Sequence, residues 1–228
     1  MNGPFTPDEW AYNPAVPVLP FDPAGAKRLL NDAGWFDAKN SGVLERNGTP
    51  FRFDLYVFVG GNGLPIAQLY QEELKKIGVV MNIVTLEPAT MFQRVLAGNF
   101  QAIYMAWDLE PDPSADTFDS KNFPPVGQNF VYYSNPQADA LIDAGRVELD
   151  HAKRIAIYRQ LSEILAADQP YTWVIQASSK WAISKRVKGV REARGFGLFL
   201  WYPGEFDWWI PKDQRIHDRA ARGQRAGS

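Results

Sequence analysis

The chain has 228 residues, 46% of them hydrophobic, and its 24 basic and 26 acidic side chains nearly balance. This length suffices for one well-packed domain or at most two small ones, and the even charge argues against nucleic acid or an anionic membrane surface as a partner. The sequence has no cysteine, which excludes disulfides and thiolate chemistry. It also has no run of the roughly 18 apolar residues that a membrane span needs.

Residues 1–20 are predicted to form an extended arm, because prolines at five positions rule out a regular helix. They also lack the basic and apolar regions of a signal peptide, so we expect no targeting segment there. The arm ends at Asp22 and Pro23, a typical N-cap and first residue of a helix. Gly34 is expected to end this helix, and its inward face would consist of Ala26, Leu29 and Leu30.

Alternating strands and helices are predicted next. Residues 51–59 alternate at first and then become wholly apolar, as a strand does when both of its faces are buried. A helix from Pro65 to Gly78 has an apolar face formed by Ile66, Leu69, Tyr70, Leu74 and Ile77. A strand at 79–86, a helix near 89–97 and a strand at 100–107 follow. This order predicts right-handed crossovers and an α/β fold, with a mixed, largely parallel central sheet and helices on both faces.

Two more helices are predicted in the second half of the chain. Asn135 caps the first, which begins at Pro136 and continues to about Val147. Asp150 caps the second, which continues to about Ala167 and has an inward face formed by Ile155, Tyr158, Leu161 and Leu165.

Three further segments are assigned from composition. Residues 171–177 and 196–202 are predicted strands. Residues 212–228 are basic, polar and almost free of apolar side chains, which favours a disordered tail. Earlier in the chain, Asn47-Gly48-Thr49 fits a glycosylation sequon and a hairpin turn equally well.

Five carboxylates lie within MAWDLEPDPSADTFDS, residues 105–120, which contains the end of the third predicted strand. Ligands of parallel sheets bind beyond the carboxyl ends of the strands. The candidate site residues are therefore Trp107, Asp108 and Glu110. The remaining acids are expected to serve mainly in turns and caps: Asp112, Asp116 and Asp119.

Catalysis, metal binding and recognition are the chemistries to weigh. Asp108 and Glu110 would suit a general acid and base if their environments separated their pKa values. A nucleophile triad lacks parts, because there is no GxSxG motif and His151 and His217 have the character of surface residues. The acidic stretch lacks the central glycine and closing glutamate of a calcium loop, so we expect neither metal nor cofactor. Recognition of a cationic or zwitterionic ligand suits a carboxylate in a cleft beside a tryptophan, whose face adds a cation–π contact of about 0.5–2 kcal/mol.

Three segments resemble the C-terminal lobe of the family 5 extracytoplasmic solute-binding proteins. They are FDPAGAKRLLNDAGW at 21–35, LYQEELKKIGVVMNIVTLEPATMFQRVLAGNFQAIYMAWDLEPDPSADTF at 69–118 and GQNFVYYSNPQADALIDAGR at 127–146. The family comprises the oligopeptide, dipeptide and nickel receptors of ABC importers. The resemblance extends over roughly residues 10–211 and implies one lobe of a periplasmic-binding-protein type II fold, with residues 21–211 as the ligand-binding lobe.

The resemblance implies a binding protein and not an enzyme. The expected partners are a peptide or similar small solute, an N-terminal lobe that this chain lacks, and an ABC permease; the expected location is periplasmic or extracytoplasmic. In peptide-binding relatives a tryptophan at this strand end lines the pocket, and an aspartate three residues later receives the peptide ammonium. Trp107 matches the first, and Glu110 stands at the second position, with Asp108 as its rival.

Two alternatives stay open: a carboxylate-based hydrolase, and a family member that binds a nickel chelate, an opine or a sugar. If the other lobe is missing, an aromatic cluster near the C-terminus should be partly exposed. It consists of Trp201, Phe206, Trp208 and Trp209.

Overall fold

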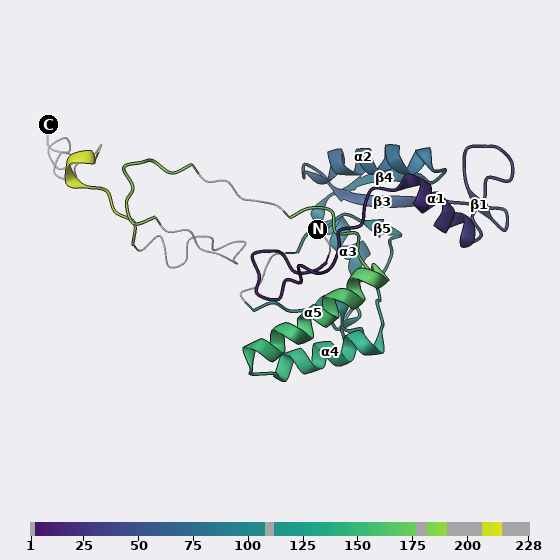
Figure 1. Ribbon diagram of the computed structural model, residues 1–228. Helices are drawn as coiled ribbons and strands as arrows, with labels where there is room; N and C mark the ends of the chain where they lie inside the picture. The colour runs from purple at the N-terminus through teal and green to yellow at the C-terminus, as the bar shows by residue number, and fades with distance from the viewer. Residues whose placement is uncertain (1–2, 108–111, 177–181, 191–206, 216–228) are drawn as a thin grey trace, which may run out of the picture.

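The computed structural model describes residues 3–107, 112–176, 182–190 and 207–215 (Figure 1). Its helices are α1 (Pro23–Asp32), α2 (Gly63–Lys76), α3 (Pro88–Leu96), α4 (Pro136–Val147) and α5 (His151–Asp168). Its strands are β1 (Glu45–Arg46), β2 (Thr49–Pro50), β3 (Arg52–Phe58), β4 (Val80–Leu86) and β5 (Ala102–Ile103). Short 3-10 helices are η1 (Asp116–Phe118), η2 (Ser120–Asn122) and η4 (Lys212–Gln214). None of the helices in these ranges has the length and apolar content required to cross a bilayer.

The central sheet has the strand order β4-β3-β5 and is parallel throughout. β3 pairs with β4 over seven residues, from Arg52 opposite Val80 to Phe58 opposite Leu86. Helices α2 and α3 lie on opposite faces of this sheet (Figure 1), which confirms the predicted α/β architecture. β4 is at the edge, where the Gln71 side chain of α2 donates a hydrogen bond of 2.7 Å to the Met81 carbonyl.

Strands β1 and β2 form a separate antiparallel hairpin. Asn47 and Gly48 connect them with φ angles of 53° and 77°. Two successive residues with positive φ are typical of the tight turns that join hairpin strands. The sequence at 47–49 therefore forms the hairpin turn that was one of its two interpretations.

Residues 3–16 are compact and not extended, so the predicted arm is wrong for this part. Backbone hydrogen bonds close successive turns, from Glu9 N to Thr6 O and from Tyr12 N to Glu9 O. Phe5 is buried against α5, with its ring centroid 5.3 Å from that of Tyr158. The prolines do prevent a regular helix, as expected, but turns also bring apolar side chains into the core.

Buried side chains form two clusters. The helix-pair cluster contains Phe5, Ala11, Ala115, Phe118, Ala138, Ile142, Tyr158, Leu161 and Leu165. The sheet cluster contains Tyr56, Met91, Val95 and Phe130. The chain passes between the clusters more than once, because Phe118 and Ala138 of the first cluster lie on either side of Phe130, which belongs to the second. The two clusters are therefore interleaved along the sequence.

Several local predictions were wrong. Residues 171–176 form no strand; Tyr171 and Trp173 instead pack against the helix-pair cluster. The third strand is short, since only Ala102 and Ile103 pair with β3. Two residues of the predicted apolar helix faces are mostly exposed, Leu29 at 71% and Leu69 at 62%.

The last part of the chain is described only in pieces. The predicted strand at 196–202 lies outside the described residues, as do Trp201 and Phe206. Trp208 is half-buried, and Trp209 is 57% exposed, as expected for a partly exposed aromatic cluster. Residues 212–214 of the predicted tail form η4, and residues 216–228 are not described.

Candidate ligand site at the carboxyl edge of the sheet

Trp107 lies just beyond the carboxyl end of β5 and is 40% exposed. Its ring stacks on the buried Phe130 ring, with centroids 5.8 Å apart and an interplanar angle of 16°. Its indole also hydrogen bonds to the side chain of Tyr171. Trp107 therefore joins the two clusters, because Phe130 belongs to the sheet cluster and Tyr171 packs against the helix-pair cluster.

The Tyr171 side chain that holds the indole is a neutral phenol. Burial raises the pKa of Tyr171 to about 12, although hydrogen bonds from Trp107 and Thr117 lower it. Its ring lies 4.9 Å from that of Phe118, in the helix-pair cluster. The support behind Trp107 thus stays uncharged at neutral pH and keeps the same hydrogen-bonding state.

Phe130 is held in place by its neighbour Asn129, which is fully buried. The Asn129 side-chain nitrogen donates to the carbonyls of Asp119 at 3.0 Å and Tyr133 at 2.8 Å. Its side-chain oxygen accepts from the Tyr133 amide at 3.0 Å. These bonds fix both ends of the segment that presents Phe130 to the tryptophan.

The predicted site residues Asp108 and Glu110 lie outside the described residues, within the stretch 108–111. Of the three predicted residues the structure therefore places only Trp107. The described chain resumes at Asp112, four residues after this stretch begins.

The other acids of the stretch are paired with two arginines. Arg154 of α5 forms a two-pronged contact with Asp112, at 2.7 and 2.9 Å. Arg146 of α4 lies 2.7 Å from carboxylate oxygens of both Asp116 and Asp119. The expectation of turn and cap roles is confirmed for Asp119, which caps η2. It is wrong for Asp112, whose side chain pairs with Arg154 on the distant helix α5. The sequence could not predict these ion pairs, because the paired residues are 27 to 42 positions apart along the chain.

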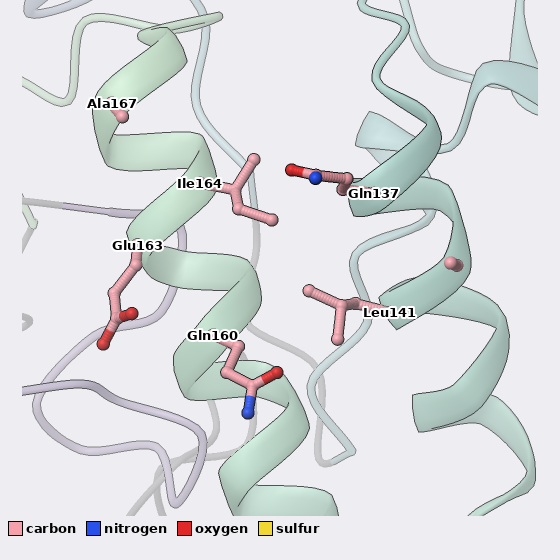
Figure 2. Close-up of a pocket in the computed structure, with 7 residues that line it drawn as sticks. Gln137, Leu141, Gln160, Glu163, Ile164 and Ala167 are labelled. Carbon is pink, nitrogen blue, oxygen red and sulfur yellow. The ribbon is translucent and has the colours of Figure 1, made fainter.

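Neither of two surface hollows in the described structure includes Trp107. One of about 600 Å³ lies between α4 and α5 (Figure 2) and is lined by Gln137, Ala140, Leu141, Gln160, Glu163, Ile164 and Ala167. The other, of about 440 Å³, lies beside α1. Trp107 thus lies outside both hollows, although 40% of its surface is exposed.

The described residues offer little for catalysis or metal binding at this edge. They contain no group of three or more histidine, cysteine, aspartate or glutamate side chains arranged to hold a metal ion. His151 is exposed and packs its ring 5.0 Å from that of Trp10. It therefore has the surface position that the sequence predicted.

Comparison with known proteins gives consistent matches. Residues 1–129 match the family described as bacterial extracellular solute-binding proteins, family 5 Middle. The oligopeptide-binding protein AppA of Bacillus subtilis is 29% identical over 215 residues, which are 92% of this chain and 39% of AppA. A dipeptide-binding protein of Escherichia coli is 28% identical over 191 residues, 80% of this chain and 34% of that protein.

Solved structures agree with these sequence matches. AppA in complex with a nonapeptide superimposes with a TM-score of 0.79 at 28% identity, covering 93% of this chain and 42% of AppA. An oligopeptide-binding protein from Thermus thermophilus, complexed with a pentapeptide, gives a TM-score of 0.67 at 24% identity over 75% of this chain. The chain spans 39% and 34% of the length of the two curated relatives.

Proposed function

The chain belongs to the bacterial extracellular solute-binding proteins of family 5, and we propose that it forms the C-terminal lobe of a receptor that captures a peptide for an ABC importer. The capture takes place between this lobe and an N-terminal lobe, outside the cytoplasm, and the loaded receptor delivers its ligand to the permease. The similarity to AppA and to a dipeptide-binding protein supports peptide as the ligand class.

The observation that carries the proposal is the half-exposed Trp107 ring beyond the end of β5. One face is held against Phe130, and Tyr171 holds the indole, so the ring has a fixed position. A fixed aromatic face offers apolar area and a cation–π contact to a ligand without a further loss of side-chain freedom. An opposing lobe would complete the pocket and exclude water from it.

Asp108 and Glu110 are the proposed receptors for the ligand ammonium. Asp112 forms an ion pair with Arg154, and Asp116 and Asp119 share Arg146. Within the stretch these two acids are therefore the remaining candidates to pair with a cation. A carboxylate that meets an ammonium in a closed cleft forms a charge-assisted hydrogen bond, which is stronger than a neutral one.

We propose binding without chemistry. The hydrolase alternative would need an acid and a base held near the ligand, and the described residues contain no cluster of side chains that could add a metal ion to them. A receptor for a nickel chelate, an opine or a sugar would prefer that ligand to a peptide, and a binding measurement with peptides would show this.

The test is calorimetry on a receptor that contains both lobes, with a mixture of short peptides. Trp107→Ala should weaken binding by about tenfold, since a cation–π contact and apolar area are lost. The matched control is Phe36→Ala, which removes another exposed aromatic side chain and should leave affinity unchanged. A receptor that binds a neutral sugar, or in which both variants bind like the wild type, would refute the proposal.

The lobe by itself should bind the same peptides weakly, because it provides only one wall of the site. Submicromolar affinity of the isolated chain would show that the site is complete within one lobe.

A further inference from the structure

We propose that the hairpin turn at Asn47-Gly48 is a site of spontaneous deamidation, at which Asn47 is converted into aspartate and isoaspartate. The turn exposes both reacting residues, whereas the fold protects a second Asn-Gly pair, Asn62-Gly63. The inference concerns the chemistry of this chain itself and does not depend on the proposed function.

The reaction needs no partner other than water. The Gly48 amide nitrogen attacks the side-chain carbon Cγ of Asn47 and forms a cyclic succinimide. The bond from Cγ to Nδ2 breaks, and ammonia leaves with the proton of the attacking amide. Water then opens the ring at one of its two carbonyls. Opening at Cγ gives aspartate, and opening at the main-chain carbonyl gives isoaspartate, in which the chain continues through the side chain.

The turn leaves both reacting groups accessible. Asn47 and Gly48 are exposed, and a Cβ built on Gly48 would meet no atom within 4 Å. Among the described residues, neither the Asn47 side chain nor the Gly48 amide has a hydrogen-bond partner. Glycine also has no side chain that could shield the attacking nitrogen. No hydrogen bond of these two groups therefore has to break before they react.

The hairpin that carries the turn can open without the rest of the fold. Its strands pair only Glu45 with Pro50 and Arg46 with Thr49, and they are not part of the central sheet. Figure 1 shows this region at one end of the molecule, beside α1. A two-stranded hairpin is at best marginally stable by itself in water. The main-chain rotation that brings the attacking nitrogen to Cγ of Asn47 is therefore a local event.

The second Asn-Gly pair has the same two residues in a different setting. Gly63 is buried at the start of α2, and a Cβ built on it would lie 2.7 Å from the Tyr104 ring. Asn62 is the N-cap of this helix, with φ −77° and ψ −1°. Rotation of Asn62 toward the succinimide would unwind the first turn of α2 and move Gly63 away from Tyr104. The fold should therefore keep this pair unreactive.

The products change the hairpin in two ways. At neutral pH, aspartate and isoaspartate each add a negative charge where Asn47 has none. Isoaspartate also lengthens the main chain of the turn by a methylene group. A two-residue hairpin loop fixes the register of its strands, so this longer turn should disrupt the pairing of Arg46 with Thr49.

The test is incubation of the full chain at mildly alkaline pH, followed by trypsin digestion, liquid chromatography and mass spectrometry. Trypsin cleaves after lysine and arginine, so the two pairs fall in separate peptides, residues 47–52 and 53–75. The remaining Asn-Gly pair, at residues 2 and 3, falls in a third, residues 1–27. We expect Asn47 to react at least about tenfold faster than Asn62, the factor that about 1.4 kcal/mol of additional opening free energy produces.

Two controls separate the fold from other causes. A sample digested without incubation measures the conversion that occurs during digestion. Incubation in guanidinium chloride removes the fold, and Asn47 and Asn62 should then react at similar rates. Equal rates in the folded chain, or conversion of Asn47 that does not exceed the digestion control, would overturn the proposal. A tenfold difference that persists in the unfolded chain would also overturn it, since the flanking sequence and not the fold would then set the rates.

Discussion

Asn129→Ala tests whether buried hydrogen bonds hold the support of the tryptophan edge. The Asn129 side chain is fully buried and makes three hydrogen bonds to main-chain groups, two at 3.0 Å and one at 2.8 Å. Alanine removes all three and adds no clash. The main-chain amide and carbonyl of Tyr133 lose this partner, whereas the Asp119 carbonyl still accepts a hydrogen bond from the Asn122 amide at 3.0 Å.

The size of the effect follows from how buried each partner is. The bond to the Asp119 carbonyl is buried, but the Asn122 amide keeps that carbonyl hydrogen bonded, so the loss of this bond costs about 0.5–1.5 kcal/mol. The two bonds to Tyr133 are part-buried, and each contributes about 0.5–1.5 kcal/mol. We expect a total loss of about 3 kcal/mol in the free energy of unfolding. For a chain of this size that corresponds to a decrease in Tm of about 6–12 °C.

The assay is thermal unfolding followed by circular dichroism, with urea unfolding as a second measure. Asn99→Ala is the matched control, because Asn99 is exposed, and its change should stay within about 0.5 kcal/mol. Tryptophan fluorescence of the folded variant should also change, since Phe130 loses its support behind Trp107. If the Tm of Asn129→Ala equals that of the control, the hydrogen bonds of Asn129 do not hold this segment.

Three further outcomes are expected. Gly78→Ala should destabilise the chain by about 2–4 kcal/mol, because φ is +87° and the new Cβ would lie 2.9 Å from Leu44 Cγ. Gly42→Ala is the control, because Gly42 has a φ of +78° but no neighbour near the new Cβ, so this variant measures the backbone strain alone. Equal losses of stability in the two variants would show that the contact with Leu44 has no effect. Leu161→Ala should cost about 2–5 kcal/mol in urea unfolding, since Leu161 is fully buried, and a loss below about 1 kcal/mol would contradict its place in the core. The pKa of Tyr171 is raised to about 12 in the folded chain, above the value near 10 in the unfolded chain. Its contribution to the free energy of unfolding is therefore complete below pH 10 and is lost as the pH rises to 12. A free energy of unfolding that does not change over this pH range would contradict the burial of Tyr171.

Local chemistry made most of the helices predictable. Asn135 and Asp150 each accept hydrogen bonds from the first turn of the helix that they were expected to cap. These signals act within a few residues, so the sequence contains them in full. The same is true of the hairpin turn at Asn47.

Predictions that depended on distant partners were less successful. Residues 171–176 have the aromatic and β-branched composition of a strand. In the structure, Tyr171 instead packs against Phe118 and holds Trp107. Leu29 lies on an apolar helix face, yet it is 71% exposed in the described structure. The pairing of Asp112 with Arg154 spans 42 residues and depends on how α5 is placed. No short-range pattern encodes such a contact.

The position of β4 at the edge of the sheet, among the strands that the structure describes, has a consequence for aggregation. In a strand, successive residues direct their main-chain hydrogen-bonding groups to opposite sides. The Val80 amide bonds toward β3, at the Phe51 carbonyl, so the groups of Met81, Ile83 and Thr85 face outward. Gln71 occupies the Met81 carbonyl from α2 and thus covers part of a surface onto which another extended chain can add. Detachment of α2 would free the Met81 carbonyl, and β4 would then offer one more main-chain group for pairing with a strand of another copy.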